Sequence, residues 1–229
     1  MARRLALALL VLGAGCGGAE EVEPTRTVSE PGIEAPELGE RIRAFAEAAA
    51  RRDDAGLFAM LTGSSQASLE PSFAEAARDL EDGIGTIAGG EVVMARRVGE
   101  VGFAALVDER IADGEREDYA YAVAFVREEG QWRIDLGGAT VSALEPDPEE
   151  ETGPTPELRA RVETAGEVGE ALMWLDGEPV RAERGSDGPF VATLEAEAPR
   201  ELAPGRHVLV VLGTGPGAAT AAAWPFTVR

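Results

Sequence analysis

Apolar residues recur at helical spacing in the first part of the segment 38–144. One stripe falls at i, i+4, i+7 and i+11: Leu38, Ile42, Phe45 and Ala49. Asp53 or Asp54 can cap a short second helix over residues 57–61, and residues 72–75 match a capping box that begins a third apolar stripe. This pattern predicts a layer of amphipathic helices.

The period of the pattern changes to two later in the same segment. Three runs alternate apolar side chains with others: residues 101–107, 119–125 and 132–136. Asp113-Gly114 and Glu129-Gly130 lie between these runs and predict hairpin turns. Helices followed by an antiparallel meander predict an α+β domain over residues 38–144.

Residues 158–229 contain short apolar runs that are separated by turn residues. Asp176-Gly177 is a two-residue hairpin signal, and Pro204-Gly205 precedes another apolar run at residues 208–212. Strands that recur at intervals of about ten residues are typical of a small all-β sandwich. We therefore expect a second domain here.

Two stretches lack any apolar period. Residues 17–37 and 145–157 are both rich in acids and prolines, and the second, EPDPEEETGPTPE, contains no base. Because like charges and proline extend a chain, we expect a disordered acidic tether at 17–37 and a semi-rigid linker at 145–157. An acidic run can also bind calcium, but the glycine-punctuated Asp spacing of a calcium loop is missing from the sequence.

The N-terminus carries an apolar run of another kind. Arg3 and Arg4 precede eight apolar residues at 5–12, and small residues then lead to Cys16, the only cysteine of the chain. The run is too short to span a bilayer as a helix and has the layout of a secretory signal. One interpretation of the cysteine is that it stands there by chance after a plain secretory signal.

The stretch Leu12-Gly13-Ala14-Gly15-Cys16 resembles the end of a bacterial lipoprotein signal, although Gly13 stands where that family usually has leucine. The resemblance implies that residues 1–16 are a signal peptide ending at a lipidated Cys16. Such a lipid carries enough acyl chains for stable membrane attachment. It also implies a location at the cell membrane, facing outside the cytoplasm.

Charge and composition narrow the classes of partner. The chain has 42 acids and 21 bases, all of them arginine, for a net charge of −21. We exclude a nucleic-acid partner, because such a surface needs cationic charge. One cysteine allows neither an internal disulfide nor a cysteine-based zinc site, and the single histidine, His207, makes a poor metal site. We expect no cofactor and no metal.

The order of elements over residues 38–144 resembles the nuclear-transport-factor-2-like superfamily. The resemblance is carried by ERIRAFAEAAARRDDAGLFAML at 40–61 and YAYAVAFVREEGQWRIDLGG at 119–138. It implies a cone-shaped α+β fold in which N-terminal helices pack on a strongly curved antiparallel sheet. The superfamily includes isomerases, dehydratases and ligand-binding modules, so this fold does not settle the function.

The C-terminal block LAPGRHVLVVLGTGPGAATAAAWPFTV at 202–228 resembles the closing hairpin of bacterial extracellular Ig-like domains, and LDGEPV at 175–180 also fits such a domain. The resemblance implies an Ig-like β domain over residues 158–229. In that fold we expect Trp224 to fill the core of the sandwich and His207 to have a structural role.

The cone is the candidate ligand site. Enzymes of the superfamily commonly use Asp with Tyr, or His with Asp, and residues 38–144 contain no histidine. Alternation of the strands points Asp135 away from the core, and Asp108 and Asp118 occupy positions that we expect to be solvated, so we expect no catalytic residue. The aromatic residues expected to line a cone pocket are Tyr119, Tyr121, Phe125 and Trp132.

These expectations describe a two-domain, membrane-anchored lipoprotein that acts as a non-catalytic binding or interaction module of the cell envelope. Its partner, besides the membrane, is a small apolar ligand or an envelope protein. Two alternatives stay open at this point. One is an isomerase or dehydratase that uses an Asp base in the cone, and the other is a purely structural envelope protein.

Overall fold

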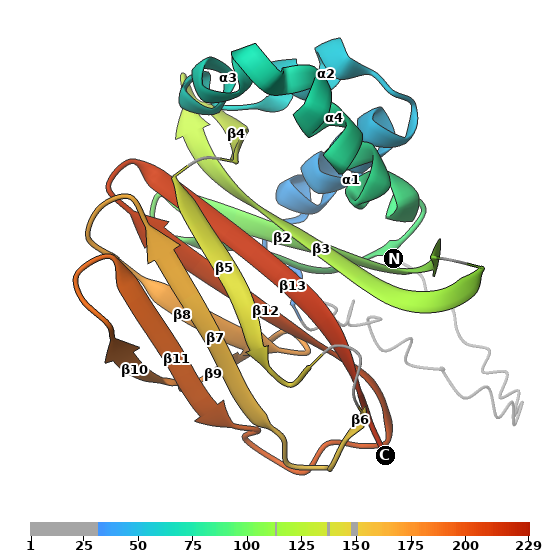
Figure 1. The fold of residues 1–229 in the computed structure, drawn as a ribbon, viewed down its shortest axis with the longest axis vertical. Coiled ribbons are helices and arrows are strands. Elements are labelled where there is room, and N and C mark those ends of the chain that lie inside the picture. Colours follow the sequence, from blue (N-terminus) through green and yellow to red (C-terminus); the bar gives the residue numbers. More distant parts are fainter. Residues whose placement is uncertain (1–31, 113, 137, 148–150) are drawn as a thin grey trace, which may run out of the picture.

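The computed structural model describes residues 32–112, 114–136, 138–147 and 151–229. Cys16 and most of the expected tether lie outside the described residues. Helices fill the N-terminal part of the described chain, and strands make up most of the remainder (Figure 1). The helical elements are α1 (Pro36–Ala50), α2 (Asp54–Met60), α3 (Gly63–Leu69), η1 (Glu70–Ser72), α4 (Phe73–Asp82) and η2 (Ile84–Ile87).

Local sequence explains where these helices begin. Pro36 starts α1, where its missing N–H costs nothing, and all four residues of the first predicted stripe are buried. The Asp53 carboxylate accepts a hydrogen bond from the Gly56 N–H at 2.9 Å and caps α2, as predicted. The predicted capping box at residues 72–75 is wrong, because Ser72 belongs to the 3₁₀ turn η1 and makes no capping hydrogen bond.

The first sheet, sheet A, is antiparallel with strand order β1-β2-β3-β4. The turn at Glu129-Gly130 has positive φ at both residues, 52° and 79°, which confirms the predicted hairpin. Helices α1, α4 and η2 pack on one face of this sheet. The strands are β1 (Glu91–Val98), β2 (Val101–Ala112), β3 (Glu115–Glu128) and β4 (Gln131–Asp135).

Two further sheets form a sandwich. Sheet B has the order β10-β11-β7-β5, and sheet C has the order β6-β13-β12-β8-β9. Trp224 and Phe226 lie in the core between them, as expected for Trp224. The strands are β5 (Ala139–Glu145), β6 (Glu151–Thr152), β7 (Glu157–Thr164), β8 (Ala171–Leu175), β9 (Glu178–Val180), β10 (Glu183–Ser186), β11 (Val191–Glu197), β12 (Gly205–Gly215) and β13 (Ala218–Val228).

The boundaries between the segments differ from those expected for the tether at 17–37, the α+β domain at 38–144 and the linker at 145–157. Strand β5, which the sequence assigns to the first segment, pairs with β7 of the sandwich. Within the expected linker, β6 pairs with the end of β13. At the N-terminal boundary, Ile33 already pairs with Ala95 of β1. A high content of acids and prolines predicts that a segment is exposed to solvent. It does not predict whether a short strand in that segment joins the edge of a sheet.

The sheets are stacked in layers. Sheet A lies between the helices and sheet C, and sheet B covers the far side of sheet C (Figure 1). Alanines at positions 105, 122 and 221 lie in the core between sheets A and C, where small side chains let the two sheets approach closely. The centroids of the Phe103 and Trp174 rings are 4.6 Å apart across this interface. The two expected domains therefore share a continuous apolar interface.

Candidate functional site

A cleft of about 350 Å³ opens beside β1, where the turn between β8 and β9 approaches sheet A. Its walls are apolar and come from three parts of the chain: Ile33, Val92, Met94, Val208 and Val210. Its polar rim consists of Glu91, Asp176 and Arg206. A concave apolar site with a few polar groups is the usual form of a small-molecule site.

The N-terminal wall of the cleft is held by backbone hydrogen bonds to β1. The N–H groups of Glu34 and Ala35 donate to the Ala95 carbonyl at 2.8 and 2.9 Å, and the Ala95 N–H donates to the Gly32 carbonyl at 3.0 Å. A β-bulge between Val92 and Met94 shifts the register of β1 against β2 at the same place. Bulges redirect side chains at the edges of sheets.

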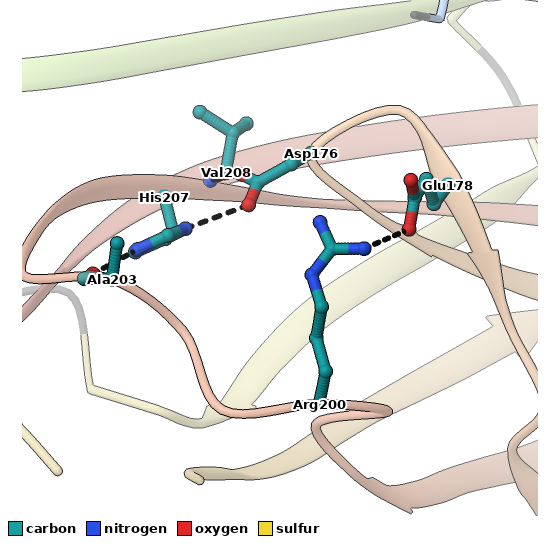
Figure 2. A network of polar contacts seen from close by, with 6 residues as sticks. All are labelled: Asp176, Glu178, Arg200, Ala203, His207 and Val208. Atoms are coloured by element: carbon teal, nitrogen blue, oxygen red, sulfur yellow. Dashed lines mark hydrogen bonds and ion pairs between the residues drawn. The ribbon is translucent and has the colours of Figure 1, made fainter. Parts of the chain in front are cut away.

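The opposite wall is a hairpin turn fixed by Asp176. Both Asp176 and Gly177 have positive φ, 49° and 83°, as the predicted two-residue turn requires. The Asp176 carboxylate accepts the Val208 N–H at 2.9 Å through Oδ1, and its Oδ2 lies 2.6 Å from His207 Nδ1 (Figure 2). The other ring nitrogen, Nε2, contacts the Ala203 carbonyl at 2.8 Å. Both nitrogens of His207 therefore serve the fold.

Ion pairs occupy most of the charged groups around the cleft. Arg206 Nη1 lies 2.8 Å from Asp118 Oδ1 on β3. Arg96 Nη2 donates to the Gly177 carbonyl at 2.9 Å and pairs with Glu34 Oε1 at 3.1 Å, which ties β1 to the turn. Among the described residues, no ion pair involves Glu91.

The four aromatic residues expected to line a cone pocket lie on the helix-facing side of sheet A. Phe125 and Trp132 are buried in the core between the helices and sheet A. Arg97 and Arg127 approach the Trp132 ring, at 5.7 and 5.4 Å from its centroid. The side chains of Tyr119 and Tyr121 are half-buried and pack against the same core. None of the four lines the cleft beside β1.

The environment of Tyr121 predicts a loss of stability at alkaline pH. Burial raises the pKa of Tyr121 to about 12, and the neighbouring Tyr119 adds to the shift. Since the unfolded value is about 10, this contribution is fully present below about pH 10 and is lost as the pH rises through about 12. Denaturant unfolding should show a decline of roughly 2 kcal/mol over this range that Tyr121→Phe removes. An equal decline in the variant would contradict the assignment.

Asp135 is the functional candidate that sequence reasoning misplaced. Alternation directs Asp135 away from the core between sheet A and helices α1 and α4, as expected, but sheet C covers that face, so Asp135 is only 4% exposed. Its Oδ1 accepts the Ser65 hydroxyl at 3.0 Å, and its Oδ2 accepts the Ala219 N–H at 2.9 Å. The Thr62 hydroxyl donates in turn to Ser65 Oγ at 2.8 Å. Asp135 thus joins α3, β4 and β13.

A second hollow, of about 270 Å³, lies next to Asp135 and is lined by Ser64, Ser68 and glycine-rich loops. No cluster of three metal-ligating side chains occurs within the described ranges. Over the same part of the chain, no helix is both long and apolar enough to cross a membrane.

Comparison with known proteins does not assign this chain to a family. No family model and no curated protein match the chain. Among solved structures it is similar to an endo-β-1,4-mannanase from Thermotoga petrophila, with 19% identity over 42% of this chain and 20% of the mannanase, at a TM-score of 0.34. It is also similar to a polysaccharide lyase, with 11% identity over 56% of this chain and 22% of the lyase, at a TM-score of 0.28.

A third similar structure is the titin Ig tandem A164–A165, with 8% identity over 61% of this chain and 98% of that one, at a TM-score of 0.26. The chain spans about a fifth of the length of the two enzymes. At these TM-scores, none of the three structures carries an argument about the fold or the function of this chain.

Proposed function

We propose that this chain is a membrane-anchored lipoprotein of the cell envelope, facing outside the cytoplasm, whose folded part binds a small ligand. The observation that carries the binding proposal is the apolar cleft of about 350 Å³ beside β1. The anchor rests on Cys16 and the apolar run before it. In this proposal the folded part presents its cleft at the membrane surface.

The fold families remain part of the proposal. A helical layer on one face of the antiparallel sheet A is compatible with a nuclear-transport-factor-2-like unit, and the sandwich of sheets B and C is compatible with an Ig-like unit. The site proposed here lies where these two units meet, rather than inside the cone. Val92 and Met94 come from the first unit, and Val208 and Val210 from the second.

Binding is favoured over catalysis by an aspartate base, because the aspartates near the cleft are already engaged. A general base must present a free atom to the proton that it removes. At the cleft, the oxygens of Asp176 already contact Val208 and His207, and Asp118 is engaged by Arg206. An isomerase or dehydratase that uses an Asp base would have to use Asp135, whose two oxygens accept hydrogen bonds that hold three elements together.

The anchor is tested by replacing the only cysteine. When the chain is produced in bacteria fed radiolabelled palmitate, the unaltered protein should carry label and sediment with membranes, because Cys16 receives the lipid. Cys16→Ser should abolish the label and release the protein from the membrane fraction. Ser29→Ala, in the acidic stretch that follows Cys16, is the control and should behave as the unaltered protein. Label retained by Cys16→Ser would contradict the proposal.

A further inference from the structure

We propose that the cleft beside β1 takes an organic cation, a molecule with a compact apolar body and one ammonium-like group directed at Glu91. This inference rests on the proposed binding function and specifies its ligand class. It depends on three features of the cleft: its apolar walls, the uneven pairing of its charges, and its size.

The apolar surface that a ligand can reach comes mainly from Ile33 and Val93, which are partly exposed. The other apolar lining residues are no more than 8% exposed and form the packed base of the cleft. Met94 and Val210 are buried in the core between sheets A and C, and Val208 belongs to the same core. Val92 lies against the helices on the other face of sheet A. These side chains are fixed by packing in two different cores, so the cleft is largely formed before a ligand arrives. A preformed apolar wall favours binding of a rigid or short apolar group.

The charges select the sign of the polar group. Arg206 is engaged by Asp118, Arg96 by Glu34, and Asp176 by His207. Each positive side chain around the cleft is thus already paired with a carboxylate. An anionic ligand would have to displace one of these carboxylates.

Negative charge is left over at one end of the cleft. Glu91 is exposed at the rim of the cleft. Asp108 lies against Gly90, which immediately precedes Glu91 in the chain. Within the described part of the chain, neither carboxylate has an ion pair. The chain as a whole carries a net charge of −21, which attracts cations over longer distances. A cationic group at Glu91 therefore meets complementary charge.

The volume limits the size of the ligand. A cleft of about 350 Å³ holds about twelve non-hydrogen atoms, if each takes about as much room as a water molecule in the liquid. Hexylammonium satisfies this limit and combines an apolar chain with one positive charge. Hexanoate and hexanol share the chain and differ only in the polar group, so the three form a matched set of probes.

The test uses the full chain carrying Cys16→Ser, with labelled methyl groups, titrated with each probe by NMR. Hexylammonium should shift the methyl signals of Ile33, Val93 and Val208, and should bind more tightly than hexanol, with hexanoate weakest. Butylammonium should bind more weakly than hexylammonium, because its chain covers less of the wall. Higher salt should weaken hexylammonium and leave hexanol unchanged.

Glu91→Gln should weaken hexylammonium about threefold to fivefold and leave hexanol unchanged, as expected for a partly exposed ion pair. Glu100→Gln, at the other end of the β1–β2 hairpin, is the matched control and should change neither. Shifts at the same methyl groups with hexanoate or hexanol preferred would overturn the cationic ligand but leave a binding site. No shift with any probe would overturn both the ligand class and the proposed binding function.

Discussion

Replacement of Asp135 by alanine is expected to destabilise the protein by roughly 2–4 kcal/mol, because two buried donors lose their acceptor. The Ser65 hydroxyl and the Ala219 N–H both donate to this carboxylate, and Ser65 is itself buried. Denaturant unfolding followed by circular dichroism measures the change. The effect should include the helical signal, since Asp135 connects α3 to β13.

Asp135→Asn separates the hydrogen bonds from the shape of the side chain. Ser65 Oγ already accepts from Thr62 and from the Leu136 N–H, so its hydroxyl is committed to donating. The NH₂ group of the new amide would then face one of the two donors, and we expect the free energy of unfolding to fall by roughly 2 kcal/mol. Asp79→Asn, on the exposed side of α4, is the control and should change stability by less than about 0.5 kcal/mol. An unchanged stability in Asp135→Asn would refute the role given to this carboxylate.

The second large effect is expected at the interface between sheets A and C. Phe103 is fully buried there and contacts Trp174. Phe103→Ala leaves a cavity that neither sheet can close, and it should cost roughly 3–5 kcal/mol. Because the interface joins all the layers, the unaltered protein should unfold in a single transition, with helical circular dichroism and tryptophan fluorescence changing together.

Ile111→Ala is the control for this experiment, because Ile111 is 76% exposed on β2 and its loss should change stability little. If the helical signal and the fluorescence melted separately, and Phe103→Ala lowered only one transition, the two halves would be independent domains. That result would also place the cleft beside β1 at a loose junction rather than between fixed walls.

Local pattern predicted the individual elements well. The stripe Leu38, Ile42, Phe45 and Ala49 is buried along one side of α1, and the turns at Glu129-Gly130 and Asp176-Gly177 have the positive φ values that their glycines suggest. These features depend on neighbouring residues alone. A helical repeat or a two-residue turn is fixed within one segment, so a single sequence carries enough information to predict it.

The sequence does not predict that sheet C packs on sheet A, because many of the side chains at this interface are alanines. In β3, Ala120, Ala122 and Ala124 alternate with larger residues that face the helices, and all three alanines are buried in the core between sheets A and C. An alanine at such a position is equally compatible with solvent and with a second sheet packed closely on it. The alternating pattern therefore identifies one buried face and leaves the other undecided.

The same limit applies to the candidate site. Alternation predicts that Asp135 points away from the core, but it does not show that sheet C covers that face, and it does not predict the cleft beside β1. Its walls come from residues 33, 92–94, 208 and 210, which are brought together only by the packing of sheet A on sheet C. The Asp176-Gly177 turn was predicted, but its contact with Arg96 across the interface was not.

Native mass spectrometry of the protein, extracted gently from the membranes of the cells that make it, tests the proposed function most directly. We expect a chain that begins at Cys16, carries the mass of the lipid, and releases a small cationic molecule when the complex is activated. A chain without lipid, or a lipidated chain whose bound molecule is an anion, would contradict the proposed function. The first result removes the anchor, and the second removes the cationic ligand.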